Sequence, residues 1–184
     1  MVADVGGRET LSVEELLAQA GAKPLIVVLD GVEDPHNVGA ILRSVDAAGA
    51  DGVVRQSRRA AALGGAAAKA SAGALAHVKI AEVVNVARAL ETLKRANVWT
   101  VGLTADGPTR YDDVDYTMST ALVVGAEGAG LRRLVRERCD FLASIPMHGS
   151  VQSLNVSVAT GVVLFEAVRQ RRGSRLVATS VPPV

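Results

Sequence analysis

The sequence predicts an α/β fold with a mostly parallel β-sheet flanked by helices. The continuous apolar run Leu25–Leu29 has the composition of a strand that is buried on both faces, as in parallel sheets. Segments of this kind alternate along the chain with segments of helical periodicity, and most connections between them are short. The 184 residues fit one domain with a sizeable core.

The alternation extends along most of the chain. Strands are predicted over residues 25–29, 51–54, 77–80, 98–103, 120–125 and 141–145. Helices are predicted over residues 38–48, 83–96, 131–138 and 155–171, and over parts of the alanine- and glycine-rich residues 58–76. Gly49 stands where a helix C-cap is expected, and residues 104–116 are predicted to be a polar loop.

The predicted domain covers residues 25–172. Residues 1–24 have the character of a linker-like lead-in, and residues 173–184, which contain glycine, serine and two prolines, are expected to form a flexible tail. Within the lead-in, Ser12 and Glu15 have the spacing of a capping box at the start of a short helix. We expect that helix to belong to a linker more than to the core.

Composition disfavours several classes of protein. The net charge of +1 argues against nucleic-acid binding by bulk charge alone, although arginines cluster near residues 55–59, 132–138 and 169–175. No apolar run has the length of a membrane span, and the first residues lack a signal-peptide pattern. Because Cys139 is the single cysteine, it cannot form an internal disulfide. These features lead us to expect a cytoplasmic protein without a membrane partner.

Three loops stand out as candidate sites. Ligands of parallel α/β sheets collect beyond the carboxyl ends of the strands, which selects the loops after Leu29, Val124 and Ile145. The same loops hold much of the most polar and glycine-rich sequence. The third loop, residues 150–160, passes from small polar residues directly into an apolar helix, where unpaired backbone N–H groups are available.

Common nucleotide, metal and hydrolase motifs are absent from these loops. The first strand is not followed by G-x-G-x-x-G, and no strand is followed by Gly-Lys-Ser/Thr, which disfavours NAD-dependent oxidoreductases and P-loop NTPases. His36, His77 and His148 lack the spacing of metal ligands, so we expect no metal site. No G-x-S-x-G elbow is present for a serine hydrolase.

The remaining candidates each have an ordinary structural interpretation as well. Ser153 or Asn155 can be a helix cap, and Glu127 in the turn Gly125–Gly130 can favour the start of the next helix through its charge. Arg43 lies six residues after Asn37 in an apolar helix, and it needs a partner only if it is buried. Taken singly, these residues leave both interpretations open.

Read together, the three loops resemble the three motifs of the SPOUT methyltransferases, in the SpoU/TrmH branch that methylates RNA ribose 2′-hydroxyls. The matching segments are Leu29-Asp-Gly-Val-Glu-Asp-Pro-His-Asn-Val-Gly-Ala-Ile-Leu-Arg-Ser44, Leu122-Val-Val-Gly-Ala-Glu-Gly-Ala-Gly-Leu131 and Ile145-Pro-Met-His-Gly-Ser-Val-Gln-Ser-Leu-Asn-Val-Ser-Val-Ala159. They occur in the family's order over roughly residues 25–172. Within the branch, the chain most resembles the bacterial enzymes that make 2′-O-methylguanosine in large-subunit ribosomal RNA.

The resemblance implies a fold, a cofactor and a partner. The C-terminal segment would form a trefoil knot, the cofactor would be S-adenosylmethionine, and the active form would be a homodimer that binds RNA. The implied cofactor contacts are Thr104, Gly125, Glu127, Gly128, Ile145, Met147, Leu154 and Asn155. We expect residues from Val156 onward to be structural.

The resemblance also implies catalytic roles. Arg43 of one subunit would reach the methyl-donor pocket of the other and help to deprotonate the ribose hydroxyl, while Asn37 and Glu127 position it and the ribose. Ser153 and Asn155 would shape the loop around the target sugar, and neither a metal nor a covalent intermediate is required. The alternatives are a transfer-RNA methyltransferase, an antibiotic-resistance ribosomal-RNA methyltransferase and a non-catalytic RNA-binding or assembly module.

One departure concerns RNA recognition. Relatives in this branch usually carry an N-terminal RNA-binding domain, whereas here only residues 1–24 precede the first predicted strand. The chain is therefore expected to be a catalytic domain alone, or to recognise RNA through its remaining arginines and a partner.

Overall fold

The fold is built on one parallel sheet with helices on both faces. A computed structural model describes residues 10–57 and 63–178, with side chains through residue 173. Among these residues, the sheet has seven strands in the order β3-β2-β1-β6-β4-β7-β5. Their bounds, in chain order, are β1 Leu25–Asp30, β2 Gly52–Gln56, β3 Ile80–Val83, β4 Trp99–Leu103, β5 Thr109–Arg110, β6 Thr120–Gly125 and β7 Phe141–Ser144. Every neighbouring pair is parallel, which confirms the predicted α/β class.

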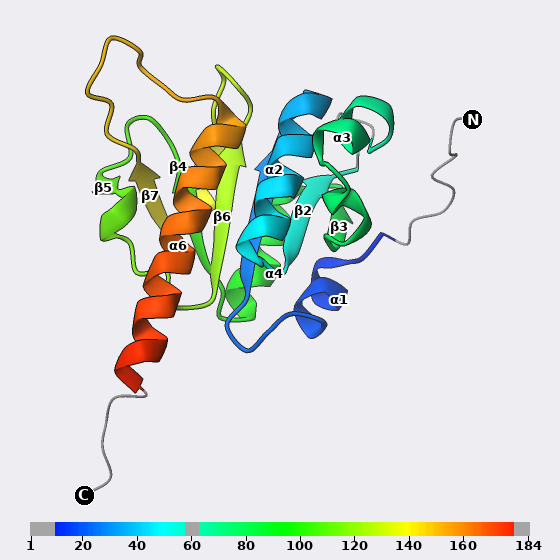
Figure 1. Cartoon of the computed structure of the whole chain (residues 1–184), viewed down its shortest axis with the longest axis horizontal. Helices are drawn as coiled ribbons and strands as arrows, with labels where there is room; N and C mark the ends of the chain where they lie inside the picture. The colour runs from blue at the N-terminus through cyan, green and yellow to red at the C-terminus, as the bar shows by residue number, and fades with distance from the viewer. Residues whose placement is uncertain (1–9, 58–62, 179–184) are drawn as a thin grey trace, which may run out of the picture.

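The helices divide between the two faces of the sheet. Figure 1 shows α2 and α6 side by side over one face, with α3 next to α2, while α4 lies behind the sheet. The bounds are α1 Val13–Ala18, α2 Pro35–Ala48, α3 Gly65–Ala70, α4 Val86–Arg95, α5 Arg133–Arg138 and α6 Val156–Ala178, with the short 3-10 helices η1 Ala74–Ala76 and η2 Tyr111–Asp113. β1 supplies both cores, because Val27 joins one buried cluster while Ile26 and Val28 join the other.

Helix ends follow the capping chemistry that the sequence offers. Ser12 and Glu15 form the predicted capping box of α1, and Gly49 ends α2 with a left-handed φ of 65°. α2 begins at Pro35, earlier than the predicted start at residue 38, because Asp34 caps it and proline suits the first helical position.

The N-terminal segment corrects one expectation. α1 packs into the core that α4 and α5 share, with Leu16 fully buried and Val13 nearly so. Leu11 also pairs with Ala81 of β3 through a backbone bridge. This part of residues 1–24 therefore belongs to the body of the fold, contrary to the expectation that it is more linker than core.

Several predicted element bounds are wrong. The strand predicted over residues 77–80 lies at Ile80–Val83, because Gly73 (φ 92°) and η1 take up the preceding residues in a turn. α4 consequently begins at Val86, capped by Asn85, rather than at residue 83. Downstream of the glycine-rich turn, α5 begins at Arg133, not at residue 131.

Two more predictions differ from the structure. The predicted loop 104–116 contains β5 and η2, and α6 runs to Ala178 instead of ending at residue 171, since Gly173 alone does not stop a helix. Residues 58–62 of the predicted partly helical tract and residues 179–184 of the predicted flexible tail lie outside the described residues.

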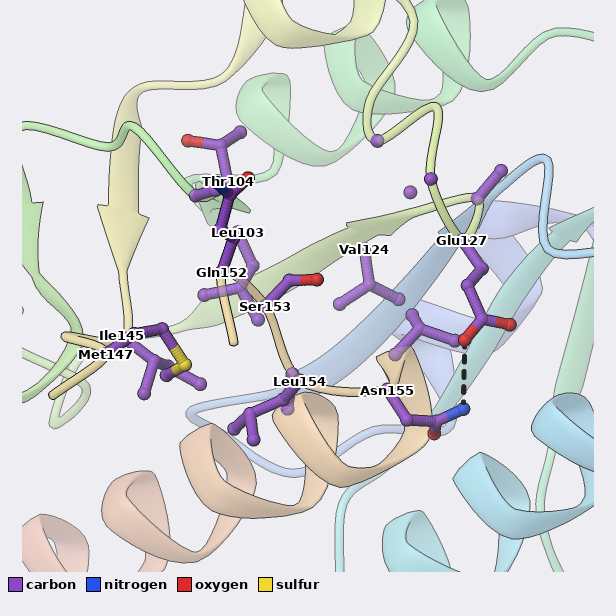
Figure 2. Close-up of a pocket in the computed structure, with 17 residues that line it drawn as sticks. Leu103, Thr104, Val124, Glu127, Ile145, Met147, Gln152, Ser153, Leu154 and Asn155 are labelled. Atoms are coloured by element: carbon purple, nitrogen blue, oxygen red, sulfur yellow. Dashed lines mark hydrogen bonds between the residues drawn. The ribbon is translucent and has the colours of Figure 1, made fainter. Parts of the chain in front are cut away.

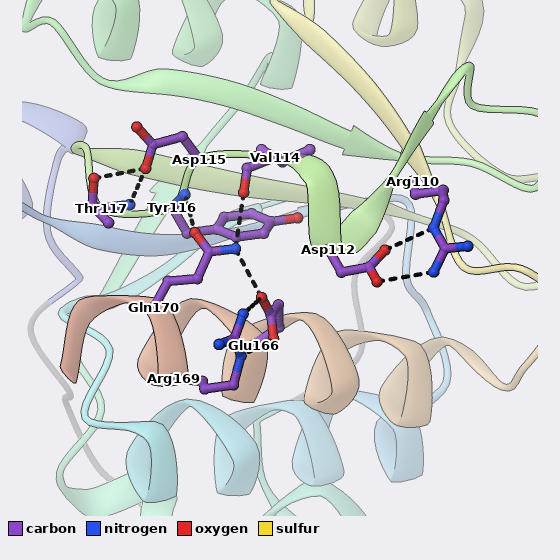
Figure 3. Close-up of polar contacts among 9 residues, drawn as sticks. All are labelled: Arg110, Asp112, Val114, Asp115, Tyr116, Thr117, Glu166, Arg169 and Gln170. Carbon is purple, nitrogen blue, oxygen red and sulfur yellow. Dashed lines mark hydrogen bonds and ion pairs between the residues drawn. The ribbon is translucent and has the colours of Figure 1, made fainter. Parts of the chain in front are cut away.

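The segment between β5 and β6 is fixed to α6 by side-chain hydrogen bonds. Gln170 accepts a hydrogen bond from Tyr116 N at 2.9 Å and donates one to the Val114 carbonyl at 3.0 Å (Figure 3). Glu166 in turn accepts from Gln170 at 2.8 Å and from Arg169 at 2.7 Å. These contacts hold this connection against the helix whose first turn borders the pocket described below.

Strand order and register do not determine how the chain threads between β7 and α6, so the trefoil knot stays a prediction. Among the described residues, none of the helices combines the length and the apolar character that crossing a membrane requires.

Candidate functional site

The carboxyl ends of β4, β6 and β7 surround a pocket of about 400 Å³ (Figure 2). Its walls come from the segment after β4, from the glycine-rich turn after β6 and from the loop between β7 and α6. The resemblance of the three motifs implied eight cofactor contacts, and all eight residues line this pocket: Thr104, Gly125, Glu127, Gly128, Ile145, Met147, Leu154 and Asn155. Ser153 lines it as well, whereas Asn37 and Arg43 are not among its lining residues.

Sequence reasoning missed eight of the seventeen residues that line the pocket. The additional lining residues are Leu103, Ala105, Val124, Ala126, Gly130, Gln152, Val156 and Ala159. Val156 and Ala159 correct the expectation that residues from Val156 onward are purely structural, because the first turn of α6 closes the pocket. Leu103 and Val124 lie at the carboxyl ends of β4 and β6, where ligands of parallel sheets bind, so their positions could have predicted them as lining residues.

The turn after β6 is shaped by close backbone packing. A Cβ atom on Gly125 would lie 2.1 Å from the Gly130 carbonyl carbon, so only glycine fits there. Gly128 (φ 77°) and Gly130 (φ 66°) adopt left-handed backbone conformations, and Gly130 N donates to the Ala126 carbonyl at 2.8 Å. The turn therefore folds back tightly and presents Glu127 and backbone groups to the pocket.

A buried carboxylate ties this turn to the first strand. Asp30, at the end of β1, is only 1% exposed, and it accepts hydrogen bonds from Arg132 N at 2.8 Å and from Arg132 Nε at 2.6 Å. The guanidinium of Arg132 balances the negative charge of this buried carboxylate, which would otherwise be costly to remove from water. It also fixes the end of the glycine-rich turn relative to the loop that leads to Asn37.

Three predicted catalytic residues meet at the rim of the pocket. Asn155 Nδ2 donates to Asn37 Oδ1 at 2.9 Å and approaches Glu127 Oε1 at 3.4 Å, and Asn37 Nδ2 donates to Glu127 Oε2 at 3.3 Å. The three side chains come from three separate segments, α2, the turn after β6 and the start of α6. Asn37 is buried at 6% exposure, so its amide orientation is constrained by this network.

Asn155 has two roles in this arrangement. Its Oδ1 caps α6 by accepting from Ser157 N at 2.9 Å, as the structural interpretation predicted, while its Nδ2 takes part in the rim network. The cap fixes the side chain so that the amide nitrogen points away from the helix. The structural and functional interpretations of Asn155 are therefore compatible.

Arg43 and Ser153 lie apart from this network. Arg43 is exposed on α2 and makes no hydrogen bond or ion pair with the residues that the structure describes. Ser153 is exposed at the pocket wall. Arg43 does not enter the pocket of its own chain.

Thr104 is the polar residue of the pocket wall that follows β4, between the apolar residues Leu103 and Ala105. Its Oγ1 is buried and makes no hydrogen bond of normal geometry with the described residues, although, after Arg136, Thr104 contributes a little to the lowered pKa of the Asp106 carboxyl. A buried hydroxyl without a partner is a costly feature in a folded protein. The hydroxyl is therefore available to a polar group that enters the pocket.

Metal-based and thiol-based chemistry have no candidate groups near the pocket. Within residues 10–57 and 63–178, no three His, Cys, Asp or Glu side chains gather as they would around a metal ion. Cys139 packs near Gly102 of β4, and burial raises the pKa of its thiol to about 12. The thiol is therefore held in its protonated, weakly nucleophilic form.

We expect Cys139 to resist thiol reagents in the native protein. Because burial raises the pKa of the thiol, it stays protonated at pH 8, and its reaction with Ellman's reagent at this pH should be slow when the protein is folded. Unfolding in guanidinium should restore the rate of an ordinary cysteine. Fast native labelling would show that this part of the fold opens readily.

Comparison with known proteins identifies the family. The family model described as SpoU rRNA Methylase matches residues 24–165 of the chain. The chain belongs to this family. The resemblance noted in the three motifs is thereby confirmed, and the seven-stranded sheet is that of a SpoU methylase.

Curated relatives of this SpoU methylase are close in sequence. A Burkholderia protein named 23S rRNA (guanosine-2′-O-)-methyltransferase RlmB is 54% identical over 160 residues, which are 87% of this chain and 65% of the relative. The RlmB of Pseudomonas putida is 50% identical over 90% of this chain and 66% of its own length. A Bacillus subtilis protein named as a putative TrmH family tRNA/rRNA methyltransferase is 45% identical and is covered to 70%. The chain thus spans about two thirds of these relatives.

Solved structures of other SpoU methylases share the fold. AviRb from Streptomyces viridochromogenes, determined in complex with the cofactor AdoMet, matches with a TM-score of 0.78 and 33% identity over 85% of this chain and 62% of its own. An A. aeolicus TrmH/SpoU tRNA modifying enzyme matches with a TM-score of 0.76 and 34% identity over 92% of this chain and 86% of its own.

Proposed function

We propose that this SpoU methylase transfers a methyl group from S-adenosylmethionine to a ribose 2′-hydroxyl of RNA, with a guanosine of large-subunit ribosomal RNA as the target. The observation that carries the proposal is the meeting of Asn37, Glu127 and Asn155 at the rim of one pocket. Support for the substrate comes from the names of relatives at 54% and 50% identity. Because the proposed substrate is ribosomal RNA, we also propose that the protein acts in the cytoplasm.

The pocket fits the proposed cofactor in size and chemistry. Its volume of about 400 Å³ lies within the roughly 300–1,000 Å³ of small-ligand sites, and most of its wall is apolar or backbone. Thr104 Oγ1 offers a buried polar group without a partner. Ile145, Met147 and Leu154 would pack against the adenosine, while Gly125 and Gly128 let backbone groups approach closely. When bound, the cofactor supplies an electrophilic sulfonium methyl group.

The residues of the chain then have to place and activate a weak nucleophile. The carboxylate of Glu127, held by the amides of Asn37 and Asn155, would orient the ribose at the pocket rim. Arg43 would bind the RNA phosphate next to that ribose and assist loss of the 2′-hydroxyl proton, with the phosphate oxygen as its acceptor. Ser153 would contact the sugar from the pocket wall.

This mechanism requires a homodimer, because Arg43 does not line the pocket of its own chain. α6 carries an exposed apolar stripe, Val158, Val162 and Phe165, at 51%, 36% and 50% exposure. Such spacing gives one helix face that a second copy would cover. α2, which carries Arg43, lies directly beside α6 (Figure 1). A second subunit on this face would bring its pocket within reach of Arg43.

Three measurements test the proposal. Calorimetry should detect S-adenosylmethionine binding by a dimer, and labelled methyl groups should be transferred to unmodified 23S ribosomal RNA. Mapping of 2′-O-methyl sites in RNA from a deletion strain would identify the target and separate ribosomal from transfer RNA. A folded dimer that binds no S-adenosylmethionine would overturn the enzymatic function and favour an RNA-binding or assembly module.

A further inference from the structure

A second recess lies beside the rim network, between α2 and α3. It is lined by His36, Gly65, Ala66, Lys69 and Ala70. His36 directly precedes Asn37, whose side chain is part of the rim network, so the recess and the pocket share the first turn of α2. Figure 1 shows α3 next to the beginning of α2, at the end of the sheet toward which the strands point. The proposed mechanism does not use this recess.

The recess has a fixed shape. A Cβ atom on Gly39 would lie 2.5 Å from both the Ala67 carbonyl oxygen and Ala70 Cβ, so α3 rests directly on the backbone of α2. After α3, the fully buried Ser71 donates to the Ala68 carbonyl at 2.8 Å, and Ala72 adopts a left-handed φ of 49°. A non-glycine residue in that region costs roughly 1–3 kcal/mol and persists only where surrounding contacts enforce it. Lys69 is therefore carried on a segment that is held rigidly against α2.

The cations beside the recess differ in charge pairing from several cations on α5 and α6. Arg133, Arg136 and Arg169 on α5 and α6 each form an ion pair with a carboxylate. By contrast, the side chains of Lys69 and His36 make no hydrogen bond or ion pair with the described residues. Arg43, one helical turn beyond Gly39, shares this property. The carboxylate nearest in sequence, Asp34, is engaged as the N-cap of α2 through His36 N at 3.0 Å.

We infer that the recess binds a backbone phosphate of the RNA. Lys69 supplies the charge, His36 supplies a hydrogen-bonding group, and the small side chains of Gly65, Ala66 and Ala70 let the sugar–phosphate chain approach the surface. This inference rests on the proposed function for the identity of the ligand. Its consequence is that RNA is aligned along α2 before the target ribose enters the rim network.

The test is the salt dependence of RNA binding by a Lys69→Gln variant of the whole chain. Binding to polyuridylate and to the 23S ribosomal RNA transcript is measured between 50 and 300 mM potassium chloride. We expect affinity for both RNAs at low salt to fall roughly fivefold to tenfold, and the slope of log affinity against log salt to fall by about 0.7 for the single-stranded probe. The affinity for S-adenosylmethionine should not change, because Lys69 does not line the cofactor pocket. Lys69→Arg, which keeps the charge, should show the same slope of log affinity against log salt as the unaltered protein.

Arg88→Gln is the matched control. Arg88 is exposed on α4, on the opposite face of the sheet, and has no ion-pair partner among the described residues. It should leave the slope unchanged. An unchanged slope for Lys69→Gln, or an equal change for Arg88→Gln, would overturn the inference. Because polyuridylate binding does not depend on methyl transfer, failure of the enzymatic function would appear separately, as absence of activity in the unaltered protein.

Discussion

Arg43→Ala should reduce methyl transfer by on the order of 10²- to 10³-fold while leaving S-adenosylmethionine affinity unchanged. That loss is typical when one preorganised charge-stabilising group is removed. Cofactor affinity should persist because Arg43 does not line the pocket, and stability should persist because the side chain is exposed and unpaired among the described residues. Single-turnover methylation of 23S ribosomal RNA and calorimetry with the cofactor measure the two quantities.

A mixing experiment shows in which subunit Arg43 acts. Arg43→Ala protein is combined with a Glu127→Ala variant, which is inactive because it lacks the rim carboxylate. If Arg43 serves the partner's pocket, the mixed dimer contains one complete site, and about half of the dimers regain up to half of the normal activity. Two inactive variants that stay inactive after mixing and subunit exchange would place Arg43 and Glu127 in the same subunit. Full activity of Arg43→Ala alone would exclude a catalytic role.

Sequence reasoning succeeded where a local pattern carries the information. Apolar runs such as Leu25–Leu29 identify buried strands, and Gly49 marks the end of a helix through its own backbone chemistry. β5, with only Thr109 and Arg110, is too short to show a period, and it was missed. The strand predicted over residues 77–80 was placed three residues too early, because the sequence does not show that the turn at Gly73 and η1 occupy the residues before β3.

The order of the strands in the sheet cannot be predicted from any local sequence pattern. β3 and β4 follow each other in the chain, yet β2, β1 and β6 lie between them in the sheet. That crossover places β4 between β6 and β7, so the segments that follow these three strands surround one pocket. The motifs identified these loops as candidates through their residue types. The hydrogen bonds among Asn37, Glu127 and Asn155 became visible only when the three segments were placed together.

The same distinction applies to glycine. Six glycines among the described residues have positive φ, and for these the backbone conformation alone explains the residue. Gly125 and Gly39 do not have positive φ, and what they require is space, because other segments of the backbone pack against them. A sequence reveals a glycine but not which of these two constraints applies. The two constraints predict different consequences of substitution.

Gly125→Ala should therefore have a much larger effect on function than an alanine at a glycine of positive φ. Its added methyl group would lie 2.1 Å from the Gly130 carbonyl carbon and 2.3 Å from the oxygen, so the turn that carries Glu127 has to move. We expect methyl transfer to fall by roughly 10²-fold, the loss that a displacement of about 1 Å can produce. Overpacking should also lower the free energy of unfolding by about 1–3 kcal/mol. Single-turnover methylation, cofactor calorimetry and denaturant unfolding measure these effects.

Gly49→Ala provides the matched control, because Gly49 has a φ of 65° but open space around the position of a Cβ atom, and it ends α2 far from the turn. It should cost about 1 kcal/mol of stability through the left-handed backbone alone and leave cofactor affinity unchanged. If Gly125→Ala lost only as much stability as Gly49→Ala and kept its activity, the turn would be able to relax without moving Glu127. The tight packing of Gly125 against Gly130 would then not be what sets the geometry of the pocket.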